Sequence, residues 1–266
     1  NFNHLAFNGI RSELAIPACK LAVKENPEES RFEFQLARAI HSKNAKGALE
    51  ARPIYEKLAL AGDVAAMYHA AATYMPYGYK VENHDDPDTD KAVSYFLAAA
   101  ELGFAPAMIG LANTRTLSNE EEFAWELKAA RAGDPIGIWK AGLVYSFDFS
   151  DAYNPEKALE WMLRGEEQGV LSSLYLLSTA YKEGKIVDAN AEKSEAYLKK
   201  SFALSAKTKM LERAMHIDAG QLGKDSLPWL ASEEIVKFLA MPERQLLMKG
   251  FVSEFLQQPV WKFSRE

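Results

Sequence analysis

Apolar and small residues recur along this chain three, four and seven positions apart, with charged residues between them. In the stretch 154-NPEKALEWMLRGEEQG-169, for example, Ala158, Trp161 and Gly165 lie on one face of a helix with about 3.6 residues per turn. The same stripe precedes five small residues (Gly62, Gly103, Gly133, Gly169 and Ser205). Glycine commonly ends a helix by adopting a left-handed conformation, so the pattern predicts an amphipathic helix that closes at each position.

The residues that open these helices also share a chemical type. Fifteen positions before each closing residue stands a residue that is favoured as an N-cap (Gly47, Asp88, Ser118, Asn154 and Asn190). Such residues satisfy the N–H groups of a first helical turn, which have no partner within the helix. Glu121 follows Ser118 at the third position and predicts a capping box.

Another helix, which begins the next repeat, is expected a few residues after each closing glycine. In each copy a small residue stands two positions before a large apolar one (Ala66 before Tyr68, Ala107 before Ile109, Gly137 before Trp139 and Ser173 before Tyr175). The small residues allow close contact between helices, and the large ones fill the gap between neighbouring repeats. A single helix pair cannot bury its apolar face, so the pairs are expected to stack.

The two helices together resemble the Sel-1-like repeat (SLR), a relative of the tetratricopeptide repeat. The best match is 137-GIWKAGLVY-145 followed by 154–169, which fits the family's Ala…Leu-Gly…Tyr first helix and Ala…Trp…Ala-Ala…Gly second helix. The resemblance implies an all-α fold, a right-handed α-α superhelix (solenoid). The sequence departs from the family in the loop between the helices, which survives faintly as 183-EGKIVDAN-190, and at Arg115, which replaces a tyrosine.

Five repeats are expected over residues 30–207 (30–63, 64–104, 105–134, 135–170 and 171–207). Residues 1–29 are predicted to form an N-terminal half-repeat, with one helix that ends near Asn26 and Pro27. Residues 208–266 have helical periodicity but do not fit the repeat. We expect them to form a helical C-terminal cap that shields the last repeat.

Composition narrows the range of functions. The 266 residues carry a net charge of −6 and contain no strongly basic cluster, which argues against nucleic-acid binding. The most apolar stretch, 95–112, is interrupted by Glu101, Gly103 and Pro106, so no membrane span is predicted. Cys19 is the single cysteine, and its apolar neighbours predict a core residue rather than a nucleophile. The chain opens at Asn1, so the compartment is left open between bacterial periplasmic or secreted and cytoplasmic.

The acidic loop 82-ENHDDPDTD-90 is the sharpest candidate for metal chemistry. Its alternating aspartates are similar to the start of a calcium loop, but Lys91 stands where glycine is required and Leu97 where glutamate is required. We therefore interpret it as a solvated loop whose Asp88 caps a helix. The histidines never pair at helical spacing, and the motifs of nucleotide-binding or hydrolytic enzymes are absent. The sequence predicts no catalytic, cofactor or metal site.

Partner binding is expected on the surface left over once the stacking positions are assigned. The resemblance implies that the first helices of successive repeats line a concave groove. The residues predicted to face it are Arg38, His69, Thr73, Asn113, Lys140 and Val144, with Tyr77 and Tyr79 in a loop beside it. A groove of this kind suits an extended or helical peptide. The hypothesis is a non-catalytic scaffold or adaptor for a protein or peptide, which also allows self-association.

Two enzyme hypotheses stay open beside the scaffold. The chain could be the accessory repeat region of a larger enzyme whose catalytic domain lies upstream of Asn1, or a weak hydrolase. A catalytic domain in the parent reading frame would favour the first of these.

Overall fold

Every regular element in the described part of the chain is an α-helix. The computed structural model describes residues 10, 12–75 and 88–218, and the side chains of residue 45 and residues 206–218 are not described. The helices are α1 Ser12–Glu25, α2 Ser30–His41, α3 Ala45–Leu60, α4 Val64–Tyr74, α5 Thr89–Glu101, α6 Ala105–Ala112, α7 Asn119–Arg131, α8 Pro135–Ser146, α9 Pro155–Glu167, α10 Leu171–Glu183 and α11 Ala191–Asp218. The chain divides into two units, 1–208 and 209–266, and the description that follows concerns the first.

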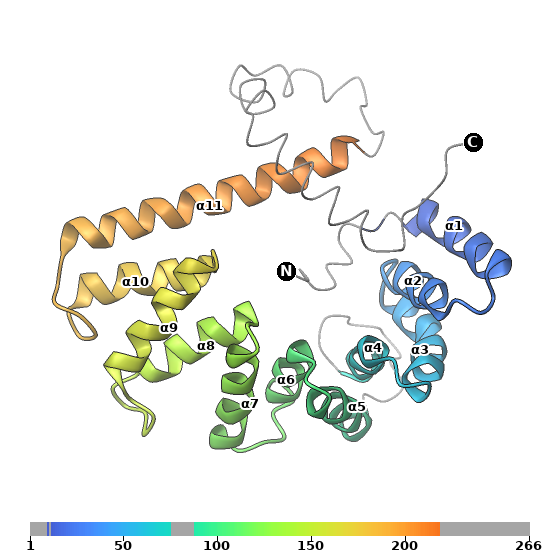
Figure 1. Ribbon diagram of the computed structural model, residues 1–266, viewed down its shortest axis with the longest axis horizontal. Helices are drawn as coiled ribbons and strands as arrows, with labels where there is room; N and C mark the ends of the chain where they lie inside the picture. The colour runs from blue at the N-terminus through green and yellow to red at the C-terminus, as the bar shows by residue number, and fades with distance from the viewer. Residues whose placement is uncertain (1–9, 11, 76–87, 219–266) are drawn as a thin grey trace. The chain divides into compact units, whose positions relative to one another are not determined.

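The helices stack as antiparallel pairs in chain order. Each helix from α1 to α10 contacts the next one, and α4 also contacts α6, as α8 contacts α10. Within this unit the pairs follow an arc, with α2, α4, α6 and α8 on its inner side and α3, α5 and α7 on its outer side (Figure 1). We call the side formed by the even-numbered helices the inner side. It carries the helices that the sequence predicts as the first of each repeat.

Most of the predicted N-caps are confirmed. The side chains of Asp88, Ser118, Asn154 and Asn190 each accept a hydrogen bond from the backbone N–H three residues later, and Ser118 with Glu121 forms the full capping box. The prediction for Gly47 is wrong, because α3 is capped by Asn44, whose Oδ1 accepts from Gly47 N at 2.9 Å. The connection between α2 and α3 is short, so the helix begins earlier than in the other repeats.

The predicted helix closures are confirmed at the four glycines. Gly62, Gly103, Gly133 and Gly169 have φ between +69° and +91°, the left-handed region that costs glycine least. The prediction that a helix closes at Ser205 is wrong, since α11 continues to Asp218. A serine has a Cβ atom and pays a steric penalty in that conformation, so this helix has no comparable stop signal.

Small residues allow the close contacts on which the stack depends. A Cβ atom built on Gly137 would lie 2.5 Å from Ala130 N, and one on Gly165 would lie 2.0 Å from Ser173 Oγ. Large residues pack both within and between repeats. The ring centre of Tyr68 lies 5.6 Å from that of Phe96 in the same repeat, and the ring centre of Phe34 lies 5.4 Å from that of His69 in the next repeat.

The stacking role predicted for Tyr175 is wrong, because its side chain is 61% exposed. Tyr175 lies on α10, the last even-numbered helix, and no further even-numbered helix of the described residues follows it. The predicted helices beyond residue 218 lie outside the described residues, and the C-terminal cap stays a prediction.

Candidate functional site

The inner side of the stack contains four equivalent three-residue sets, which we call junctions. Each junction takes one residue from an even-numbered helix or its end, one from the odd-numbered helix that follows, and one from the next even-numbered helix. The second and third residues lie seven positions before and seven positions after the closing glycine. In chain order the junctions are Arg38–Tyr55–His69, Ala72–Phe96–Gly110, Asn113–Glu126–Lys140 and Leu143–Met162–Leu176.

The middle residue of each junction forms a buried floor. Tyr55 is 0% exposed, and the equivalent residues of the other junctions are at most 7% exposed (Phe96, Glu126 and Met162). The residues from the even-numbered helices are more accessible in most junctions, with Asn113 exposed and Arg38, Lys140 and Leu143 part-exposed. The inner side therefore presents a different chemical group at each junction above a floor that is packed.

The third junction brings together two residues that the sequence predicts for the site. Lys140 Nζ donates to Asn113 Oδ1 at 3.0 Å and forms a shorter ion pair with Glu126 Oε1. The Glu126 side chain is only 9% exposed, and the Lys140 side chain is 21% exposed. Sequence reasoning missed Glu126. Its signal was a lone charge at a position that holds Tyr, Phe or Met in the other repeats.

The first junction does not place His69 on a surface, which corrects the sequence prediction. His69 is 1% exposed, and its ring stacks on Tyr55 with centres 4.9 Å apart. The rings of Phe34 and His41 meet the same pair edge-on. Burial lowers the pKa of His41 from 6.5 to about 4, because a charged imidazolium is poorly solvated there. The predicted residue that stays accessible in this junction is Arg38.

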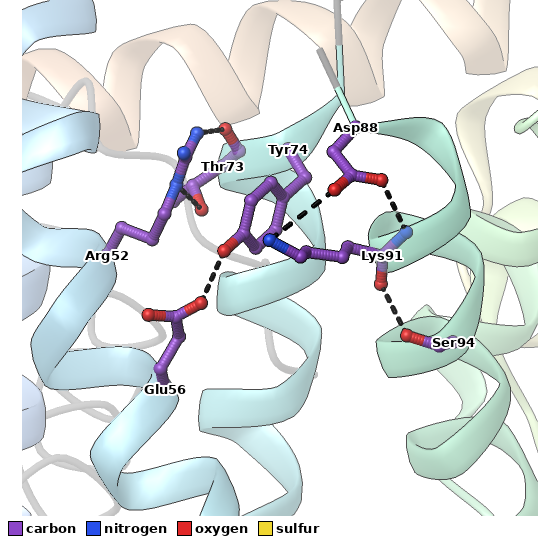
Figure 2. A network of polar contacts seen from close by, with 7 residues as sticks. All are labelled: Arg52, Glu56, Thr73, Tyr74, Asp88, Lys91 and Ser94. Carbon is purple, nitrogen blue, oxygen red and sulfur yellow. Dashed lines mark hydrogen bonds and ion pairs between the residues drawn. The ribbon is translucent and has the colours of Figure 1, made fainter. Parts of the chain in front are cut away.

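Thr73 is likewise buried rather than facing a groove, and it belongs to a polar network at the end of α4 (Figure 2). Arg52 of α3 donates from Nε to Thr73 Oγ1 at 3.1 Å and from Nη2 to the Thr73 carbonyl. The same guanidinium lies over the Tyr74 ring, with Cζ 4.0 Å from the ring centre. Arg52 therefore satisfies a carbonyl that the helix end leaves without an internal partner.

Tyr74 links three helices in this network. Its hydroxyl donates to Glu56 of α3, and Lys91 of α5 lies 5.2 Å from its ring centre while pairing with Asp88 at 3.4 Å (Figure 2). Burial and the hydrogen bond to Glu56 raise the pKa of Tyr74 to about 12. The hydroxyl therefore stays protonated at neutral pH and acts as a structural donor rather than as a base.

The contact between a tyrosine and a lysine recurs at equivalent positions of later repeats. Lys157 lies 5.4 Å from the centre of the Tyr145 ring, and Lys193 lies 5.0 Å from that of Tyr181. In each case the lysine stands three residues after the N-cap. The third repeat differs, because Arg115 takes the tyrosine position with φ +60°. Each of these contacts joins the two helices of one repeat, so the tyrosines have a structural role within the repeat.

The other predicted residues fall into two groups. Val144 is half-buried on α8, one turn after Lys140, and it stays a candidate for partner contact. Tyr77 and Tyr79 lie outside the described residues, as does most of the acidic loop 82–90. Cys19 is half-buried, and burial raises the pKa of its thiol.

Two features are absent from the part of the chain that the structure describes. No cluster of three or more His, Cys, Asp or Glu residues that could hold a metal ion occurs in the ranges 12–75 and 88–218. Among the helices described, none combines the length and the apolar character needed to cross a membrane.

Comparison with known proteins identifies the fold of this chain. No protein-family model and no curated protein matches the sequence. A Sel1 repeat protein from Oxalobacter formigenes has a similar structure, with a TM-score of 0.58 and 19% identity, over 75% of this chain and 85% of that one. A protective antigen of uropathogenic Escherichia coli strains, described as displaying an SLR fold, has a TM-score of 0.51 and 17% identity over 70% of this chain. The chain spans 45% of the length of the E. coli protein. The chain is therefore an α-α solenoid with the Sel1-like repeat fold.

Proposed function

We propose that this chain is a non-catalytic adaptor that binds a partner protein or peptide along the inner side of α2 to α10. The observation that carries the proposal is the contrast between the junctions and the rest of the stack. The small residues and glycine closures keep one chemical type from repeat to repeat, whereas the junctions change from cationic to small, to ion-paired, to aliphatic. Packing alone does not require this variety, because the helices stack at all four junctions although the junction residues differ in chemical type.

The fold supports the proposal in a general way. Stacked helical repeats form extended concave surfaces, and such surfaces suit long or helical peptides better than small substrates. The accessible residues of the inner side, Arg38, Asn113, Lys140 and Val144, lie on three different even-numbered helices or at their ends. A partner that contacts all of them has to extend along the stack rather than enter a single pocket.

A peptide library displayed on phage and selected against the purified chain tests the proposal. The affinity of a selected peptide is then measured by fluorescence anisotropy for the parent chain and for two variants of the inner side, Asn113→Ala and Val144→Arg. We expect Val144→Arg to weaken binding by about tenfold or more and Asn113→Ala by less, since few interface residues carry most of the energy. Circular dichroism at 222 nm checks that each variant is folded.

The matched control is Leu163→Arg, which adds the same charge at an exposed position of α9. It should leave the affinity within about twofold, because an exposed position outside the contact surface contributes little. The proposal fails if folded Val144→Arg binds as tightly as the parent chain. It also fails if the library yields no saturable binder.

A further inference from the structure

Arg38 carries a largely buried charge that the described part of the chain does not neutralise. Its Nη1 donates to Gln35 Oε1 at 3.2 Å, and its Nε is buried without a hydrogen-bond partner. Its electrostatic neighbour is Tyr55, a neutral residue, and burial lowers the pKa of the guanidinium. A guanidinium offers five N–H donors, and removing one from water is costly unless an acceptor replaces the water.

The third junction shows what is missing from the first. At the position of Tyr55 it has Glu126, which pairs with the cation of its own junction, Lys140. In the first junction the floor residue is instead the phenol of Tyr55, which is 0% exposed and whose hydroxyl has no hydrogen-bond partner in the part of the chain that the structure describes. The two junctions have the same place in the repeat, but only the third contains its own carboxylate.

The surroundings of Arg38 are aromatic rather than acidic. Its electrostatic neighbour Tyr55 stacks on His69, and the rings of Phe34 and His41 meet Tyr55 edge-on. None of these four side chains is acidic. A buried hydroxyl without an acceptor and a guanidinium with unused N–H groups are both donors, so the ligand that fits is an acceptor with negative charge.

We propose that Arg38 binds a carboxylate of the partner peptide, which supplies in the first junction the charge that Glu126 supplies in the third. This inference rests on the proposed function and gives the partner its chemistry: an acidic side chain or a C-terminus that reaches α2 while the rest of the peptide follows the inner side. The planar guanidinium suits a bidentate contact with the two carboxylate oxygens, and the Tyr55 hydroxyl is the next donor at the floor.

Nuclear magnetic resonance of the full chain tests the proposal directly. The Nε–Hε signal of Arg38 is identified as the one absent from Arg38→Lys. The chain is titrated with acetyl-Gly-Glu-Gly-amide, with the neutral acetyl-Gly-Gln-Gly-amide, and with acetyl-Gly-Gln-Gly that has a free C-terminus. We expect a saturable shift of the Arg38 signal with one or both carboxylate peptides, and none with the neutral peptide; comparison of the two carboxylate peptides distinguishes a side chain from a C-terminus.

The exposed Arg131 provides the internal control for non-specific charge effects. If the Arg38 signal moves no more than that of Arg131, or moves equally with the neutral peptide, the inference is overturned. The proposed function would survive that result if Val144→Arg still abolished binding of the selected peptide. If Val144→Arg did not change the affinity for the selected peptide, the proposed function would fail, whatever the result at Arg38.

Two variants separate a binding role from a structural one. Tyr55→Glu places the carboxylate of the third junction into the first, and it should remove the shift of the Arg38 signal by occupying the guanidinium internally. If that variant does not fold, Tyr55→Phe still tests the idea, because it removes only the hydroxyl. Tyr55→Phe should weaken binding of the carboxylate peptide by a few-fold without lowering the denaturant midpoint, since the hydroxyl has no hydrogen-bond partner among the described residues. Unchanged peptide binding in both variants would contradict the proposal.

Discussion

The first and third junctions occupy the same place in the repeat but manage charge in opposite ways. In the third, Lys140 and Glu126 neutralise each other above a closed floor. In the first, the electrostatic neighbour of Arg38 is the phenol of Tyr55, and no described residue supplies it with a carboxylate. The difference shows that the repeat separates two tasks. Closing glycines and small contact residues hold the helices together, and the junction residues are then available for chemistry that stacking does not require.

The largest effect should come from breaking the ion pair of the third junction. Glu126→Ala leaves the Lys140 ammonium without its carboxylate, and loss of one partner of a buried pair costs about 3–5 kcal/mol. Because the Lys140 side chain is 21% exposed, we expect a smaller loss of unfolding free energy, about 2–3 kcal/mol. Urea denaturation measures it. The double variant Glu126→Leu with Lys140→Met should recover most of the loss, and a double variant as unstable as Glu126→Ala would show that the pair is not the cause.

Acidification should destabilise the aromatic cluster beside the first junction, in which His41 packs against Tyr55. The pKa of His41 is about 4 in the folded chain, against an ordinary value of 6.5, so between these values the unfolded chain binds more protons. Stability is therefore complete above pH 6.5 and is lost as the pH falls toward 4. From pH 7 to pH 5 we expect a loss of about 2 kcal/mol from this group. Denaturant midpoints at both pH values, compared with those of His41→Phe, isolate it, and equal losses in the two proteins would exclude His41.

The second junction should respond to size rather than charge. A Cβ atom at Gly110 would lie 2.5 Å from the Phe96 ring, so Gly110→Ala forces the ring out of its position. Overpacking of this kind costs about 1–3 kcal/mol, partly offset because alanine is the better helix former. Thermal unfolding of Gly110→Ala beside Gly110→Ala with Phe96→Leu measures it. A second substitution that fails to restore the melting temperature would contradict the clash.

The smallest effect on stability is expected at the floor of the first junction. Tyr55→Phe removes a buried hydroxyl that hydrogen-bonds to none of the described residues, so the unfolding free energy should stay within about 0.5 kcal/mol of the parent value or rise. Chemical denaturation measures this change. A loss of about 1 kcal/mol or more would reveal a hydrogen bond of that hydroxyl in solution.

Local signals were predictable from the sequence, and their errors have local causes. Four N-caps and four glycine closures follow from backbone groups that need partners within a few residues. The cap at Gly47 is wrong because Asn44 competes for the same role and is the stronger acceptor. The predicted helix end at Ser205 is wrong because serine lacks the backbone freedom with which glycine adopts the left-handed conformation.

The candidate site was harder to predict, because it depends on contacts across repeats. His69 and Thr73 stand between the predicted stacking positions, yet both side chains are buried in the stack. Glu126 was missed since its partner, Lys140, lies on the next helix. Periodicity reports which face of a helix is apolar, but not how deeply the adjacent repeat covers its edge.

The sequence by itself determined the helical stack, the order of its helices and the points where most of them begin and end, because those features arise from short-range hydrogen bonding and from the spacing of apolar residues. Only the tertiary structure decided which polar residues are buried together. The Lys140 charge meets a carboxylate, whereas the Arg38 charge meets none among the described residues. This difference depends on the side chains that three separate helices bring to one junction.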